Sequence, residues 1–180
     1  MRTYVIEESP FSHFFLANTK SALLWLAARI YLGWMWLEAG WGKLSNPAWI
    51  GENQGAAMTG FVERALTKTA GAHPDVQGWY AAFLENAVLP YVDVWSYAIV
   101  FGEIAVGIAL ITGLLTGLAA FFGLFMNLNF MLAGTVSMNP IMFTIAIGLV
   151  LSWRVAGYYG LDRYVLPMLH NYFRPRTSGG

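Results

Sequence analysis

Four apolar stretches, each close to twenty residues long, constrain this chain more than any other feature of its sequence. The hydrocarbon core of a bilayer is about 30 Å thick, so a helix needs roughly 20 apolar residues to cross it. Backbone amides in lipid must be satisfied within the segment, which makes the helix the natural structure for such a stretch. The sequence therefore predicts an all-α, integral membrane four-helix bundle. Its spans are expected at residues 21–44, 92–112, 114–135 and 140–158.

The composition supports this interpretation. Of the 180 residues, 57% are hydrophobic and 11% are charged, whereas soluble domains average about 45–50% apolar and about 25% charged residues. The formal net charge is zero and no run of lysine and arginine is present, so the lipid bilayer is an expected partner and nucleic acid is not. The chain has no cysteine, which excludes thiolate metal sites and a dithiol relay within it.

The rest of the chain is divided around these spans. Residues 1–20 are expected to form a cytoplasmic or interfacial segment, residues 21–167 the membrane domain and residues 168–180 a C-terminal tail. Positive residues are more numerous on the side of both termini, so we predict a multi-pass protein of the cell membrane with both termini in the cytoplasm. The residues counted are Arg2, Lys20, Arg154, Arg163, Arg174 and Arg176, against Lys43, Arg64 and Lys68.

The loop at residues 45–91 lies outside in this topology and is too long to be structureless in so small a protein. Apolar residues from Val76 to Val88 follow the spacing of one helical face, and residues 60–71 predict a weaker helix. We expect these short interfacial helices to form an outer lid (residues 45–91) over the mouth of the bundle. Simple anchoring of the loop on lipid explains the pattern equally well.

Charged residues inside the predicted spans are informative because a charge in lipid is costly. A rise of 1.5 Å per residue from the cytoplasmic ends places Arg29 about 12 Å deep and Glu103 about 13 Å deep. An unpaired charge at this depth would be strongly unfavourable, so we predict that Arg29 and Glu103 form an ion pair inside the bundle. Lys43 is expected at the outer rim.

Glu38 lies about 25 Å from the cytoplasmic end of the first span and points almost opposite to Arg29. A partly desolvated carboxylate at this depth could exchange a proton with a quinone or a substrate near neutral pH. A salt bridge to Lys43 or to the outer loop is the simpler alternative. Trp36 and Trp41 lie beside these charges and could stack on a quinone head group.

Asn127 and Asn129 fall in the outer half of the third span. Because they are two residues apart they cannot share a helix face, and Asn127 lies on the side with small residues that suits the bundle interior. A hydrogen bond between helices explains Asn127 as well as a ligand role does.

The histidines argue against a resident metal cofactor. His13, His73 and His170 all lie outside the predicted spans, so no pair of them can ligate haem across the bundle. The chain also lacks the ligand spacing of a metal site. We therefore expect no haem and no metal.

Three segments carry a resemblance to a known family. They are RIYLGWMWLEAGWGKL, FGEIAVGIALITGLLTGLAAFFGLFMNLNFMLAGTVSMNP and GYYGLDRYVLP. With these segments the chain resembles the DoxX/DoxD family of four-helix membrane proteins over about Leu24 to Pro167. It is most similar to the branch that contains the large, DoxD-like subunit of thiosulfate:quinone oxidoreductase. The resemblance implies motif positions at Arg29, Gly33, Trp36, Gly40, Trp41, Lys43, Gly102, Glu103, Asn127, Gly134, Thr135, Ser137, Asn139 and Pro140.

The resemblance implies a membrane subunit of a quinone-linked oxidoreductase, with oxidation of thiosulfate to tetrathionate as the specific expectation. It also implies a separate partner subunit or a larger membrane complex. The alternatives are a non-catalytic accessory subunit of a respiratory or other membrane complex, and a small transporter or lipid-binding module. The lack of an inverted repeat disfavours a transporter. The expected catalytic residues are Glu38, Glu103 and Arg29, and the expected substrate- or quinone-binding residues are Trp36, Trp41, Lys43, Asn127 and Asn129.

Overall fold

The computed structural model describes residues 9–173, and this part of the chain is helical throughout its regular structure, without a strand. The prediction of an all-α protein is confirmed for these residues. The positions of Arg2, Arg174 and Arg176, which entered the topology prediction, lie outside the described residues. The helices are α1 (Pro10–Ala17), α2 (Ala22–Leu44), α3 (Ala56–Leu66), α4 (Gly78–Phe83), α5 (Val92–Thr112), α6 (Thr116–Leu132), α7 (Asn139–Leu151), α8 (Trp153–Ala156) and α9 (Asp162–Phe173).

The predicted spans agree with the observed helices best where no turn intervenes. The first two coincide with α2 and α5 to within one residue. The third is shorter than predicted because the turn after α5 needs left-handed backbone at both Gly113 and Leu115, with φ of 69° and 48°. The fourth is interrupted at Ser152, whose hydroxyl donates to the Gly148 carbonyl at 2.7 Å, so α7 ends and α8 begins there.

Glycines bring α2 and α5 together as a close antiparallel pair. A Cβ added at Gly40 would lie 2.7 Å from Ile104 Cγ1, and one at Gly33 would lie 3.0 Å from the carbonyl oxygen of Gly107. Small residues let helix backbones approach where lipid supplies no hydrophobic driving force. The resulting register places Gly40 directly against Glu103.

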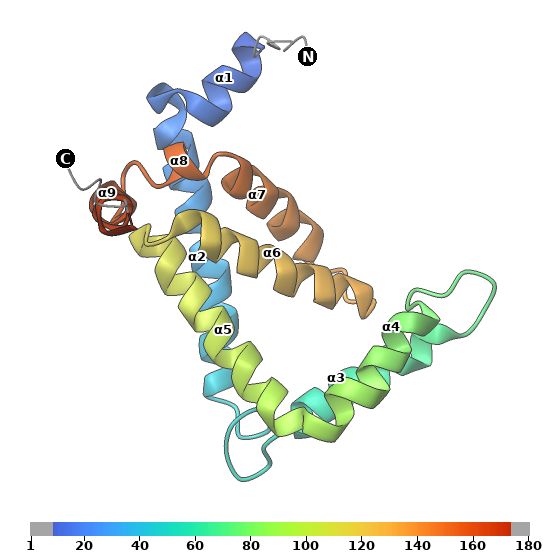
Figure 1. The fold of residues 1–180 in the computed structure, drawn as a ribbon. Coiled ribbons are helices and arrows are strands. Elements are labelled where there is room, and N and C mark those ends of the chain that lie inside the picture. Colours follow the sequence, from blue (N-terminus) through green and yellow to red (C-terminus); the bar gives the residue numbers. More distant parts are fainter. Residues whose placement is uncertain (1–8, 174–180) are drawn as a thin grey trace, which may run out of the picture.

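The remaining helices build a wedge on this pair. α6 packs along α7, α5 contacts α6, and α2 contacts α7. Figure 1 shows α5 and α6 starting together at their turn and then diverging, with α3 and α4 lying across the open end. One core surrounds Trp36 and Leu110, and a second surrounds Val62 and Tyr80 where the outer lid meets α5 and α6. The outer lid is therefore a packed part of the fold.

Among the described helices, the stretch Gly78–Thr112 is the one that is both long and apolar enough to cross a membrane. It bends sharply between α4 and α5 (Figure 1), where a π-type turn at Leu84–Val88 is followed by Pro90. The straight part, α5, is about 32 Å long. α6 and α7 are apolar but shorter, and α2 carries three charged side chains.

Candidate functional site

Glu103 forms its ion pair with Lys43. Lys43 Nζ donates to both carboxylate oxygens at 2.8 and 2.7 Å, and only 1% of the Glu103 side chain is exposed. The predicted pair between Arg29 and Glu103 is therefore wrong. That prediction assumed that α2 and α5 reach the same depth, whereas α5 ends level with Arg29, at Gly113. Because the helices are antiparallel, this offset moves Glu103 toward the C-terminal end of α2, within reach of Lys43.

Arg29 belongs to a separate polar cluster at the other end of the helix pair, which we call the inner clamp (Arg29, Tyr159 and Asp162). Arg29 Nη2 donates to the Tyr159 carbonyl at 2.9 Å and interacts electrostatically with Asp162. The Asp162 carboxylate accepts from the backbone N–H groups of Leu115 at 2.5 Å and Thr116 at 2.8 Å. These are free N–H groups at the start of α6, so Asp162 acts as its cap.

The Lys43–Glu103 pair lines a cavity of about 320 Å³, which we call the polar chamber. Lys43 Nζ lies 5.4 Å from the ring centre of Trp49 and 6.0 Å from that of Phe130, within the range of cation–π contact. An ammonium group has three N–H donors, and two of them bind Glu103. One donor of Lys43 thus remains for an acceptor on a ligand. Trp36 and the polar residues Thr135, Ser137 and Asn139 also line this chamber.

Asn127 supports the polar chamber from behind its wall. Its side chain is fully buried, and Nδ2 donates to the side-chain and main-chain oxygens of Asn139 at 2.8 and 3.1 Å. Asn139 Nδ2 donates in turn to the Thr135 carbonyl at 2.9 Å. This chain of bonds holds the loop between α6 and α7, in which Ser137 has a left-handed φ of 38°. The hydrogen bond between helices that the sequence left open for Asn127 is present.

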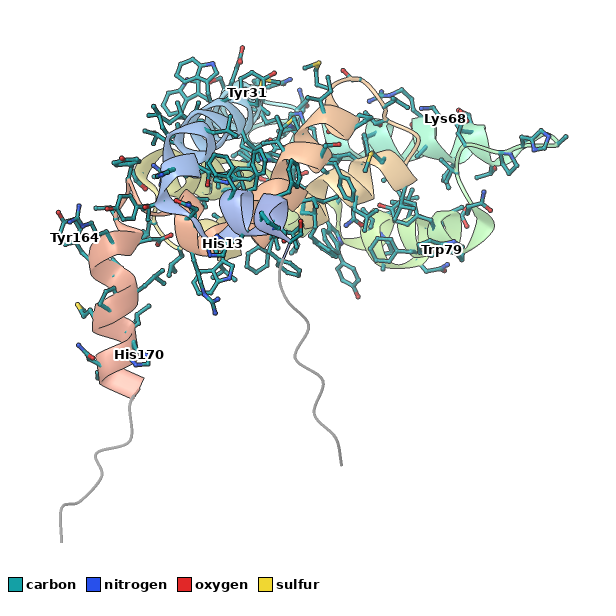
Figure 2. The ribbon with its side chains drawn as sticks, turned by 90° about the horizontal axis from the view of Figure 1, so that it is seen from above. His13, Tyr31, Lys68, Trp79, Tyr164 and His170 are labelled. Carbon is teal, nitrogen blue, oxygen red and sulfur yellow. The ribbon has the colours of Figure 1, made fainter. Side chains whose placement is uncertain are left out.

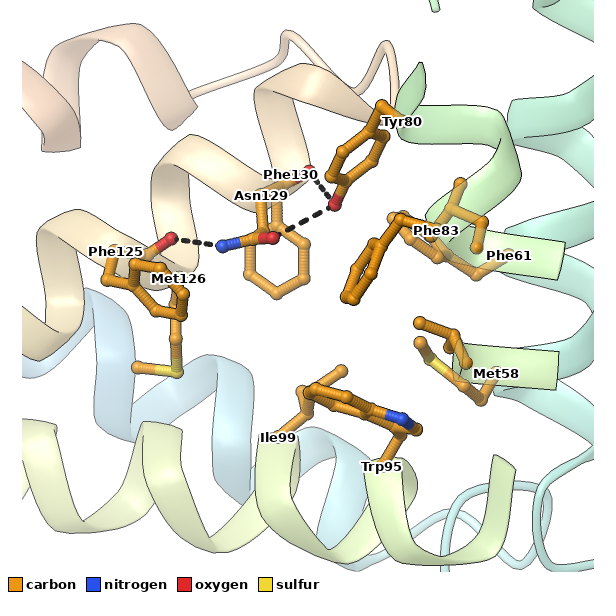
Figure 3. A pocket seen from close by; sticks show the side chains of 12 residues that line it. Met58, Phe61, Tyr80, Phe83, Trp95, Ile99, Phe125, Met126, Asn129 and Phe130 are labelled. Atoms are coloured by element: carbon orange, nitrogen blue, oxygen red, sulfur yellow. Dashed lines mark hydrogen bonds between the residues drawn. The ribbon is translucent and has the colours of Figure 1, made fainter. Parts of the chain in front are cut away.

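A second cavity of about 110 Å³, the apolar chamber, lies between the outer lid and the diverging helices α5 and α6 (Figure 3). Its walls are mostly apolar and aromatic side chains, including Phe83 and Trp95. Its polar end is formed by Tyr80 and Asn129. The Tyr80 hydroxyl lies 3.1 Å from Asn129 Oδ1 and 3.0 Å from the Asn129 carbonyl, and Asn129 Nδ2 donates to the Phe125 carbonyl.

Phe61 and Phe130 line both chambers and form an aromatic wall between them. Their rings meet edge to face with centres 6.0 Å apart. The Trp36 ring continues this contact on the side of the polar chamber, with its centre 6.4 Å from that of Phe130. The ion pair and the Tyr80–Asn129 end are thus on opposite sides of one layer of aromatic rings.

Glu38 and Trp41 lie at neither chamber. Both are exposed on the outer surface of α2, and Trp41 exposes 63% of its area. Within residues 9–173 Glu38 has no hydrogen bond or ion pair, so the alternative of a Glu38–Lys43 salt bridge is wrong. The structure therefore separates the residues predicted to act together: Lys43, Glu103 and Trp36 meet at the polar chamber, and Asn129 lies at the apolar chamber.

Sequence reasoning missed Tyr80 and the aromatic wall. Tyr80 counts as one more apolar residue on a predicted lid helix, and Phe61 and Phe130 look like ordinary core residues. A usable signal was the hydroxyl of Tyr80, because a tyrosine on a buried face needs a hydrogen-bond partner. That partner, Asn129, lies in a different predicted span.

No three histidine, aspartate or glutamate side chains gather to hold a metal ion in the part of the chain that the structure describes. Figure 2 shows His13 on α1 and His170 on α9, a helix that projects from the rest of the molecule. Neither histidine lines the polar or the apolar chamber.

We expect Tyr80→Phe to loosen the outer lid. The variant removes the hydrogen bond to Asn129, which stabilises the closed lid by about 0.5–1.5 kcal/mol, and leaves the bond from Lys68 Nζ to the Gly134 carbonyl as a second link. Amide hydrogen exchange should become several-fold faster in α3 and α4 and stay unchanged in α2. Trp79→Phe, at a side chain 64% exposed, is the control. Unchanged exchange in the Tyr80 variant would contradict this role.

Comparison with known proteins gives one finding. The DoxX family model matches residues 24–136, which include α2, the outer lid, α5 and α6 and therefore most of the residues that line both chambers. No curated protein and no solved structure matches the chain. Because the match covers well over half of the chain, this protein belongs to the DoxX family of membrane proteins.

Proposed function

We propose that this protein is the membrane subunit of a quinone-linked oxidoreductase. The supporting observation is the pair of chambers: a buried ion pair in a polar cavity, separated by one aromatic wall from an apolar cavity with a polar end. Electrons from a substrate in the first chamber would have only this wall to cross to an acceptor in the second. The resemblance to the thiosulfate enzyme supports the same reaction class.

The apolar chamber suits the ring of a quinone. Its volume of about 110 Å³ is close to that of an engineered cavity of about 150 Å³ that binds benzene, so it has room for a single ring. Asn129 Nδ2 keeps one N–H that can donate to a quinone carbonyl, and the Tyr80 hydroxyl can donate to it by exchanging its bond to Asn129. The other walls can stack on the ring or pack against it.

The polar chamber suits a small polar electron donor. Glu103 neutralises Lys43, so an anionic donor must compete with this carboxylate for the lysine. Such an exchange would free Glu103 to carry protons. With thiosulfate as donor, two ions join to form tetrathionate and release two electrons, and the quinone takes up these electrons with two protons. Glu103, which lines the polar chamber, is the residue that we assign to proton uptake. The aromatic wall separates it from the quinone, so we assign the last transfer to the quinone carbonyl to the Tyr80 hydroxyl, which lines the apolar chamber. Arg29 and Glu38 lie outside both chambers and receive no step.

We place α2, α5, α6 and the succession of α7 and α8 across the membrane, with both termini in the cytoplasm and the outer lid on the opposite side. Lys43 then lies near the outer surface, where a polar donor arrives from water. A separate partner subunit would bind on this side and deliver or receive the substrate.

The test is an activity assay of purified protein, alone and with the proteins that co-purify from its native membrane. We expect thiosulfate-dependent reduction of decylubiquinone, and a loss of about 100-fold or more in Glu103→Gln, because general acid–base groups contribute about 10²–10⁴-fold. Glutamine keeps the size of the side chain and an acceptor for Lys43. Glu63→Gln, at an exposed carboxylate of α3, is the matched control. Normal turnover by Glu103→Gln would remove this residue from the mechanism.

A non-catalytic accessory subunit is the second candidate, and the inner clamp favours it, because its buried Arg29 and Asp162 hold the helix ends in place and line neither chamber. This role predicts stable co-purification with cytochromes, visible in a haem spectrum, and no quinone reduction by the purified chain under any of the conditions above.

A further inference from the structure

A groove of about 500 Å³ runs along α5 and α6 on a side of α5 that does not pack on α2. We call it the α5–α6 groove. It extends from Trp95 to Ala109, about 21 Å along the helix axis. Small residues of α5 form one side, namely Ala98, Gly102, Ala105 and Ala109, and larger ones of α6 form the other, namely Leu118, Phe122 and Phe125.

The small residues of α5 are what keep the groove open. At Gly102 an added Cβ would already lie 3.4 Å from Met126 Sδ on the facing helix. Ala105 is exposed in the middle of the groove and fills little of it. α5 diverges from α6 toward the outer lid (Figure 1).

The groove adjoins the apolar chamber. Trp95, Ile99, Phe125 and Met126 line both cavities. Figure 3 shows these four side chains on the sides of the chamber away from Tyr80. Groove and chamber together therefore have one polar end, at Tyr80 and Asn129, and one long apolar arm.

We infer that the α5–α6 groove holds the isoprenoid tail of a quinone whose ring occupies the apolar chamber, and that this quinone enters sideways from the bilayer between α5 and α6. The inference rests on the proposed function. A small neutral ring on a long apolar chain matches both parts of the cavity. A phospholipid matches only the groove, because its charged head group exceeds the chamber and finds no counter-charge at Tyr80 and Asn129.

A membrane helix of a partner protein could also pack on the small residues of α5. Such a helix would cover the groove along its whole length, but it would make no use of the adjoining apolar chamber. The four residues that line both cavities therefore favour a ligand with a head and a tail.

The experiment compares two probes in the full-length protein, reconstituted in phosphatidylcholine nanodiscs. The probes are ubiquinone-4, which carries four isoprene units, and its tail-less parent ring. Ala105→Trp fills the middle of the groove, and Ile108→Trp places the same side chain at an exposed position of α5 outside it. Partitioning of a probe into the disc is the same for every variant, so it does not affect the comparison of their affinities. The disc lipids supply an excess of acyl chains, which compete with the probe for the groove.

We expect Ala105→Trp to weaken binding of ubiquinone-4 by about tenfold or more, which corresponds to lost burial of about two CH₂ groups. Ala105→Trp should bind the tail-less ring with the affinity of the wild type. Ile108→Trp should bind both ubiquinone-4 and the tail-less ring with the affinities of the wild type. Equal ubiquinone-4 affinity in Ala105→Trp and the wild type would overturn the tail site and leave the ring site standing. Failure of the wild type to bind either probe would overturn the proposed function as well.

A second variant tests whether Ala105→Trp acts by distorting the apolar chamber. If Ala105→Trp weakens the binding of both probes equally, the same two affinities are measured in Ala109→Trp, which fills the groove farther from the chamber. Selective loss of ubiquinone-4 in this variant supports the tail site, and equal affinity for ubiquinone-4 in this variant and the wild type overturns it.

Discussion

Replacing Lys43 by methionine is expected to destabilise the protein by about 3–5 kcal/mol, because it leaves the Glu103 carboxylate buried without its partner. The two partners are not equivalent, since 22% of the Lys43 side chain is exposed and only 1% of Glu103. Glu103→Gln should therefore cost less, because the lysine left behind can reach water. The free energy of unfolding, measured by titration with a denaturing detergent, checks this order.

The double variant Lys43→Met, Glu103→Met distinguishes the effect of the ion pair on the free energy of unfolding from its effect on quinone reduction. A buried ion pair replaced by apolar side chains of similar volume is often neutral or stabilising, so the double variant should recover most of the stability lost in Lys43→Met. It should nevertheless show no quinone reduction, because it has neither the cation nor the proton carrier. If it turns over normally, the pair is a packing element, and the accessory-subunit alternative gains support. A cost below about 1 kcal/mol for Lys43→Met would mean that the pair behaves as an exposed one.

Replacing Asp162 by alanine, at the other end of the α2–α5 pair, is expected to cost about 3 kcal/mol or more. Its carboxylate accepts two backbone hydrogen bonds, and hydrogen bonds to charged groups contribute about 1.5–3 kcal/mol each. Asp162 is 3% exposed, interacts electrostatically with the buried Arg29 and caps the first N–H groups of α6. Nε and Nη1 of Arg29 have no hydrogen-bond partner within residues 9–173, and Asp162 adds a favourable electrostatic interaction to its charged form. Thermal unfolding and the amount of folded protein in membranes measure the effect.

Two further variants calibrate the Asp162 prediction. Asp162→Asn keeps one acceptor for the α6 cap and removes the charge, so its cost should lie between those of the wild type and the alanine variant. Asp75→Ala, at an exposed position of the outer lid, should stay within about 0.5 kcal/mol of the wild type. Equal stability of Asp162→Ala and Asp75→Ala would show that the inner clamp does not hold the turn between α5 and α6.

Helix positions could be predicted from the sequence where local rules decide them. The bounds of α2 and α5 follow from apolar length, and Pro140 is found in the first turn of α7, as its missing N–H allows. The ends of α6 could not be predicted as well, because Leu115 is driven into a left-handed conformation by a turn whose N–H groups bind Asp162, 47 residues away.

The residues of the candidate site could likewise be predicted from the sequence only in part. The sequence identified Arg29, Glu103 and Asn127 as costly polar groups in apolar surroundings and placed Lys43 at the outer rim, because hydropathy and charge are properties of the chain alone. Their partners depend on the register of α2 against α5, and contacts at Gly33 and Gly40 with distant residues set this register. Helical depth counted from each helix end cannot supply that offset, so Arg29 was assigned the partner that belongs to Lys43.

The sequence by itself thus determined an all-helical membrane protein of the DoxX family with charges buried in its helices. Only the tertiary structure decided which charges meet, that Glu38 faces outward, and that Phe61 and Phe130 stand between two chambers. The physical reason is the sequence separation of the residues that interact. Helix formation depends on neighbours within a few residues. A cavity is formed by side chains from helices far apart in the chain, and the relative positions of these helices follow from close packing.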